Sequence, residues 1–79
     1  MIVEYRAARG LYESSGLDAA GVEPYLTNTR FDLKAIAVVR PCELNTAWCC
    51  VHLHGDPTPF VVAETYDRLS SYWTCEQGR

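Results

Sequence analysis

A chain of 79 residues has room for one small domain, which buries only about 60% of the surface that its unfolded form exposes. Its formal net charge is -3 with a single lysine, whereas a nucleic-acid surface needs clustered basic residues, so we expect no direct contact with nucleic acid. Residues 1–10 lack the apolar segment of a signal peptide, and no apolar run approaches the roughly 18 residues of a membrane span. We therefore expect a cytoplasmic protein without membrane contact, whose four cysteines are reduced.

The first elements in chain order are a strand and a long loop. Residues 2–8 alternate apolar and charged side chains, which predicts a strand. Residues 10–28 contain three glycines and a proline and predict a long surface loop, in which residues 17–22 can form a short helix. Long loops in compact domains are usually mobile or functional, so this segment is a candidate for binding.

Residues 30–40 predict one long strand that Pro41 ends. Alternate positions place one apolar set on a single face: Phe31, Leu33, Ala35, Ala37 and Val39. Ile36 and Val38 make the opposite face apolar as well, so this strand is central in its sheet or meets a partner there.

Residues 47–63 predict a hairpin. Over residues 47–54 the apolar set Cys49, Val51 and Leu53 is expected to face the core, and its alternates to face away. The sequence GDPTP at residues 55–59 is typical of a turn, and residues 60–63 predict the returning strand.

A helix is predicted over residues 64–73, followed by a polar tail at 75–79. Thr65 is suited to cap its first turn and Asp67 to complement its dipole. Spacing predicts an apolar stripe of Tyr66, Leu69 and Trp73 against the sheet. These elements predict one α+β domain over residues 1–79, with a small three- to four-stranded, mostly antiparallel sheet and the C-terminal helix on one face. The aromatic core is expected to comprise Tyr5, Phe31, Trp48, Phe60, Tyr66 and Trp73.

A family resemblance covers about a third of the chain, within residues 47–73. The segment resembles the strand–turn–strand–helix part of LytTR-type DNA-binding modules and of FlbD-type flagellar proteins. The resemblance implies a fold more than a function, and the DNA-binding role of LytTR-type modules conflicts with the acidic composition. The matching positions are Val51, Leu53, Gly55, Phe60, Val62, Glu64, Thr65 and Leu69.

The strand predicted over residues 47–54 suggests one metal site. Cys50, His52 and His54 share one face at steps of about 6.5–7 Å, and Cys with His is a zinc ligand set that Cys42, Cys49 or Cys75 could complete. The alternative is a strand with exposed histidines and buried, inert thiols, and no cofactor. A nucleophilic Cys50 with a histidine, oriented by Glu43 or Asp56, has the right residue types, but same-strand neighbours rarely reach hydrogen-bond distance, so we expect no enzyme.

Elimination leaves protein binding as the expected function. Tyrosines dominate interface hot spots, so the predicted partner-binding residues are Tyr12, Tyr25 and Tyr72 with the acids Asp18 and Glu23. By size and acidity the chain is similar to small phage-encoded inhibitors, including anti-CRISPR proteins, which implies occlusion of a surface on a larger protein or complex. The alternative is a homo-oligomeric structural or regulatory domain, with zinc at Cys50, His52 and His54 as an added stabiliser.

Overall fold

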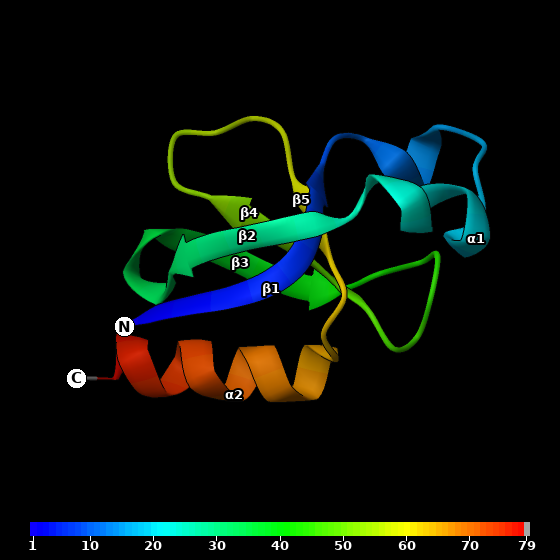
Figure 1. The fold of residues 1–79 in the computed structure, drawn as a ribbon. Coiled ribbons are helices and arrows are strands. Elements are labelled where there is room, and N and C mark those ends of the chain that lie inside the picture. Colours follow the sequence, from blue (N-terminus) through cyan, green and yellow to red (C-terminus); the bar gives the residue numbers. More distant parts are fainter. Residues whose placement is uncertain (79) are drawn as a thin grey trace.

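The computed structural model describes residues 1–78 and has a five-stranded antiparallel sheet with two α-helices. The strands lie in the order β2-β1-β5-β4-β3, and every neighbouring pair is antiparallel. The α+β prediction is therefore confirmed, with more strands than expected (Figure 1). The bounds are β1 Ile2–Arg9, β2 Thr27–Asp32, β3 Ile36–Pro41, β4 Cys49–Leu53, β5 Phe60–Val62, α1 Ala19–Val22 and α2 Tyr66–Gln77, with the 3-10 turns η1 Tyr12–Ser14, η2 Glu23–Tyr25 and η3 Leu33–Ala35.

The single strand expected over residues 30–40 is wrong, because η3 divides it into β2 and β3. The Asp32 carboxylate accepts a hydrogen bond from the Lys34 amide at 3.0 Å, and this local bond favours a turn over continued pairing. β2 then pairs with β1, while β3 pairs with β4 at the other edge of the sheet. Since η3 alone joins the two edge strands, the sheet curls so that its edges approach each other at this corner (Figure 1).

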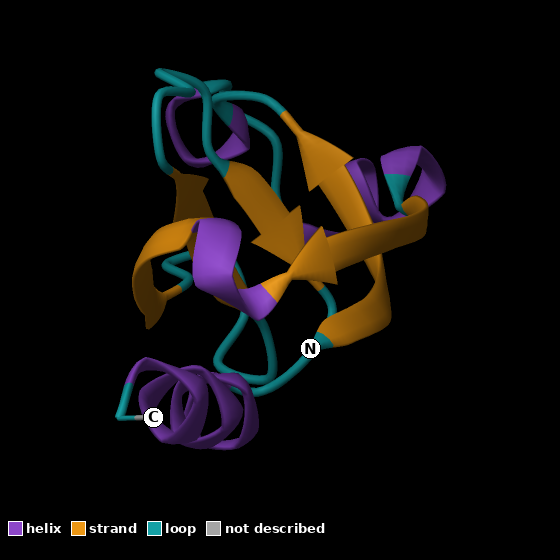
Figure 2. Ribbon diagram, turned by 90° about the vertical axis from the view of Figure 1, so that its left-hand side faces the viewer, coloured by secondary structure: helices purple, strands orange, loops and turns teal. Residues whose placement is uncertain are grey.

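The first core cluster lies between the sheet and α2, which Figure 2 shows end-on below the strands. α2 packs mainly on β3, β4 and η3, and Leu69 is fully buried in this cluster. The Trp73 indole fixes the helix further by donating to the Ile36 carbonyl at 3.0 Å. The buried members of the cluster are Ala7, Phe31, Leu33, Ile36, Val39, Cys49, Val51, Val62 and Leu69.

A second cluster lies on the opposite face of the sheet, under the segment 10–26. The expectation for that segment is a surface loop with a short helix within residues 17–22. The helix is present as α1, but the segment also forms η1 and η2 and buries Val22 and Leu26 against the sheet, so it is more than a surface loop. It therefore forms a cover for the second face, and we call residues 10–26 the lobe. The buried members of the second cluster are Ala8, Val22, Leu26, Cys42, Trp48, Cys50 and Val61.

The expectation that Ile36 and Val38 lie together on one apolar face of a single strand is also wrong. The β3–β4 register shifts between these two residues, so their side chains no longer share an environment. Ile36 is buried in the first cluster, whereas Val38 is 46% exposed on an edge strand.

The start of α2 agrees with the sequence and its end does not. Thr65 caps the helix, because its hydroxyl accepts from the Arg68 amide at 3.3 Å, and Asp67 lies in the first turn. The helix then continues to Gln77, one turn beyond the predicted end, where a buried Glu76 carboxylate binds the amino group of Met1 at 3.1 Å. Tyr66 is exposed rather than part of the apolar stripe. Of the predicted polar tail, only Arg79 lies outside the described residues.

Candidate functional site

A pocket of about 250 Å³ lies where the lobe meets the sheet. Residues 10–14 form its wall on the lobe side, and Arg40, Glu43 and Cys50 line it from β3, the β3–β4 connection and β4. The Gly10 amide fixes the start of the lobe by donating to the Pro59 carbonyl at 3.0 Å. The pocket thus joins residues that are far apart in the sequence and brings polar groups to the edge of the second core cluster.

Glu13 and Arg40 form the central ion pair of this pocket. One oxygen of Glu13 accepts from the Arg40 guanidinium, and the other accepts from the Glu43 amide at 2.9 Å. The hydrogen bond from Arg40 lowers the pKa of Glu13 to about 2, and the same bond raises the pKa of Arg40. Arg40 also donates from Nε to His52 Nε2 at 3.0 Å, so this histidine nitrogen acts as an acceptor.

Two buried thiols lie against the Glu13 carboxylate. The Sγ atoms of Cys42 and Cys50 and a carboxylate oxygen of Glu13 all lie within 4.8 Å of one another. Burial is the main cause that raises the pKa of Cys50, so its thiol is protonated at neutral pH and is a poor nucleophile. Cys49 faces the first cluster instead, where burial raises its pKa to about 12. The vicinal cysteines therefore serve opposite faces, and all four cysteines are free thiols.

The structure does not gather the ligand set that the sequence suggested. Cys50 is buried at the pocket, His52 is half-buried against Arg40, and His54 is exposed in the turn after β4. In residues 1–78, three suitable ligand atoms come within 4.8 Å of one another at Glu13, Cys42 and Cys50, and not at the two histidines. Asp56, one of the two candidate orienting acids, binds Arg9 instead.

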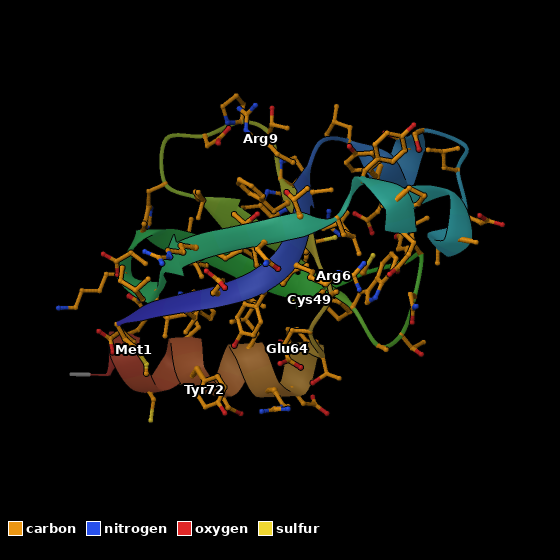
Figure 3. The ribbon with its side chains drawn as sticks, viewed as in Figure 1. Met1, Arg6, Arg9, Cys49, Glu64 and Tyr72 are labelled. Atoms are coloured by element: carbon orange, nitrogen blue, oxygen red, sulfur yellow. The ribbon has the colours of Figure 1, made fainter. Side chains whose placement is uncertain are left out.

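Four of the predicted partner-binding residues lie on the lobe. The rings of Tyr12 and Tyr25 are in contact, with centroids 5.9 Å apart. Asp18 is exposed and caps α1 by accepting from the Gly21 amide at 2.8 Å, and Glu23 is exposed and pairs with Arg6 at 2.6 Å. The fifth residue, Tyr72, lies on α2, apart from the lobe, as Figure 3 shows.

Sequence reasoning missed Glu13 and Arg40 as site residues, and it named Cys42 only as one of three cysteines that could complete a ligand set with Cys50. In the β3–β4 register Arg40 lies opposite Cys50. This strand pairing could have placed Arg40, and Cys42 two residues after it, near Cys50. No local pattern could have placed Glu13, because it lies in an irregular segment that reaches the site only through tertiary packing.

In comparisons with known proteins, no family model, no curated protein and no solved structure matches the chain. Among residues 1–78, no helix is both long enough and apolar enough to cross a membrane.

Proposed function

We propose that this chain is a non-enzymatic protein-binding module that occludes a surface of a larger protein or complex. A phage-encoded inhibitor, such as an anti-CRISPR protein, is the particular kind we propose. The main support is the surface of the lobe, where three large apolar side chains are exposed: Leu11 at 65%, Tyr25 at 56% and Leu17 at 41%. Aromatic and aliphatic anchors on a small, well-packed element are typical of binding hot spots.

The charge of the lobe indicates the chemistry of the partner. Residues 10–26 hold three acidic residues and no basic ones, whereas the seven acidic and seven basic residues of the rest of the chain cancel. Glu13 and Glu23 are paired with Arg40 and Arg6 at the base of the lobe, and Asp18 lies exposed on it. The partner we propose therefore has an apolar patch bordered by lysine or arginine, which the net negative charge attracts.

The pocket supports binding over catalysis. Glu13 is held by Arg40 and the Glu43 amide, and the Cys50 thiol is protonated by reason of its burial. A general base or a nucleophile needs a pKa close to the working pH, and neither group has one.

The test is affinity capture from source cells with the tagged wild-type chain and three variants. We expect one protein to be enriched by the wild type and by Tyr72→Ala, and to be lost with Tyr25→Ala and with Leu17→Asp. Tyr72 is the matched control because it is also an exposed tyrosine but lies on α2. Circular dichroism checks that each variant is folded. Equal recovery of the same protein by all four baits, or no enrichment by any, contradicts the proposal.

A homo-oligomeric domain is the second candidate, and one observation favours it. Val38 is 46% exposed on β3, which is an edge strand with unpaired backbone groups. Light scattering distinguishes the two candidates, because a free monomer has a mass of 8.9 kDa and a dimer has twice that mass. A monomer across the micromolar range excludes this second candidate.

A further inference from the structure

The three ligand atoms of Glu13, Cys42 and Cys50 have nearly the separations of a tetrahedral metal site. They lie within 4.8 Å of one another. Zinc bonds of about 2.3 Å to sulfur and 2.0–2.2 Å to oxygen set ligand separations of roughly 3.5–3.8 Å in a tetrahedron. The ligand atoms therefore need to approach one another by at most about 1.3 Å, a movement within reach of small side-chain rotations.

From this arrangement we infer that Glu13, Cys42 and Cys50 bind one thiophilic divalent cation, with Zn²⁺ as the fitting ion. Two sulfur ligands select against magnesium and calcium, which take oxygen ligands, and favour zinc. The site differs from the histidine set considered above and shares only Cys50 with it.

The charges of the site balance when the ion is bound. Two thiolates and one carboxylate contribute three negative charges, and the cation with the Arg40 guanidinium contributes three positive charges. Binding releases the two thiol protons to solvent. Arg40 can therefore keep its hydrogen bond to Glu13 while the ion is bound, and a buried net charge is avoided.

The carboxylate is already held in place by neighbouring groups. Arg40 donates to one oxygen of Glu13 and the Glu43 amide donates to the other at 2.9 Å. Each carboxylate oxygen has a second lone pair, so either can take the metal without losing its present bond. Hydrogen bonds of this kind orient metal ligands and are a regular part of protein metal sites.

The pocket supplies both entry and the fourth ligand. Cys50 and Glu13 line the pocket of about 250 Å³, so a hydrated ion can reach them from solvent. The three protein ligands leave one tetrahedral position open, and we place a water molecule of the pocket there. The buried sides of Cys42 and Cys50 lie in the second core cluster, which shields the sulfur atoms.

Bound metal would join three separate parts of the fold: the lobe through Glu13, the β3–β4 connection through Cys42, and β4 through Cys50. Its effect is therefore to hold the lobe on the sheet. The inference does not depend on the proposed protein-binding function and can be tested on the isolated protein.

The experiment is titration of the purified, reduced protein with Co²⁺ and then Zn²⁺, followed by absorption spectroscopy. We expect one equivalent of Co²⁺ to give the intense visible bands of tetrahedral cobalt and a near-ultraviolet band from two thiolates, and Zn²⁺ to remove both. Cys42→Ala and Cys50→Ala should each abolish the tetrahedral bands, and Glu13→Gln should weaken cobalt binding at least tenfold. Cys75→Ser and His54→Ala should match the wild type, because both residues are exposed and lie outside the site.

Circular dichroism of each apo variant shows whether it is folded, and Glu13→Gln provides a test that leaves both thiols in the core. The inference is overturned if the wild type shows no thiolate–cobalt band at equimolar metal. It is also overturned if Cys50→Ala or Glu13→Gln binds cobalt like the wild type. Loss of the bands in His54→Ala would overturn it too, in favour of the ligand set of Cys50, His52 and His54.

Discussion

The guanidinium of Arg9, the last residue of β1, binds both carboxylate oxygens of Asp56 in the β4–β5 connection, at 2.9 and 3.2 Å. Asp56 also accepts from the Thr58 amide at 2.9 Å, so one carboxylate holds the loop in its turn and ties it to the end of β1. A turn that sequence alone predicts from glycine and proline is thus fixed by a residue more than forty positions earlier.

The Arg9–Asp56 pair predicts a shifted titration. The hydrogen bond from Arg9 is the main cause that lowers the pKa of Asp56 below its usual value of 3.8. A lowered pKa in the folded state means that this stabilising contribution is present above that usual value and is lost as the pH falls through the folded pKa. In Arg9→Gln we expect the Asp56 midpoint, followed by carboxyl NMR, to rise towards 3.8, and Arg6→Gln to leave it unchanged. An unmoved midpoint in Arg9→Gln would contradict the pairing.

Leu69 is expected to be the most costly position to truncate on α2. It is fully buried in the first core cluster, so Leu69→Ala removes apolar contacts and leaves a cavity. We expect a loss of about 2–5 kcal/mol in the free energy of unfolding, measured by urea denaturation. Tyr66→Ala on the same helix is the control, since Tyr66 is 37% exposed, and it should cost less than half as much. Equal losses would mean that the helix does not pack on the sheet through Leu69.

The cap of α2 makes a separate, smaller contribution. Thr65→Ala removes the acceptor of the Arg68 amide, which should lower stability by about 1 kcal/mol. Thr74→Ala, an exposed position inside the helix, should be neutral or slightly stabilising because alanine has the higher helix propensity. The same urea experiment measures both, and a neutral Thr65→Ala would show that the cap contributes nothing.

Gly55 is expected to resist substitution for backbone reasons alone. Its φ of +76° lies in the left-handed region, and beyond its two chain neighbours no heavy atom lies within 4 Å of the position that a Cβ would occupy. Gly55→Ala should therefore destabilise the domain by about 1–2 kcal/mol through backbone strain without any clash. Gly55→Asn should cost less, because asparagine tolerates this conformation better than alanine. Equal stability of Gly55→Ala and the wild type would argue against this turn conformation.

The sequence predicted best the elements whose signals are local. Strand alternation, the GDPTP turn and the Thr65 cap place β4, β5 and the start of α2 correctly. The break at Leu33–Ala35 was missed, because the apolar alternation of residues 30–40 continues through it and only the pairing of β2 and β3 with different partners reveals it. The burial of Glu76 was also missed, because its partner Met1 lies far away in the sequence and no local pattern indicates the contact.

The candidate site was less predictable than the fold. Period-two alternation correctly grouped Cys50 with His52, and both touch the Arg40–Glu13 network. Cys42 and Glu13 reach that place only because the β3–β4 register and the folding of the lobe bring them there. A ligand set assembled from three separate segments leaves no spacing motif in the sequence.

The central strand of the sheet is β5, the last strand in the sequence, which pairs with β1 through Ala7 opposite Val62 and with β4 on its other side. During synthesis on the ribosome, β1 therefore lacks one of its two neighbours until all the other strands have been made. β2 can pair with β1 early, but the edge that β5 must fill stays open meanwhile. The nascent domain consequently presents an unsatisfied strand edge for longer than a sheet built from sequential hairpins, until β5 joins β1 to β4.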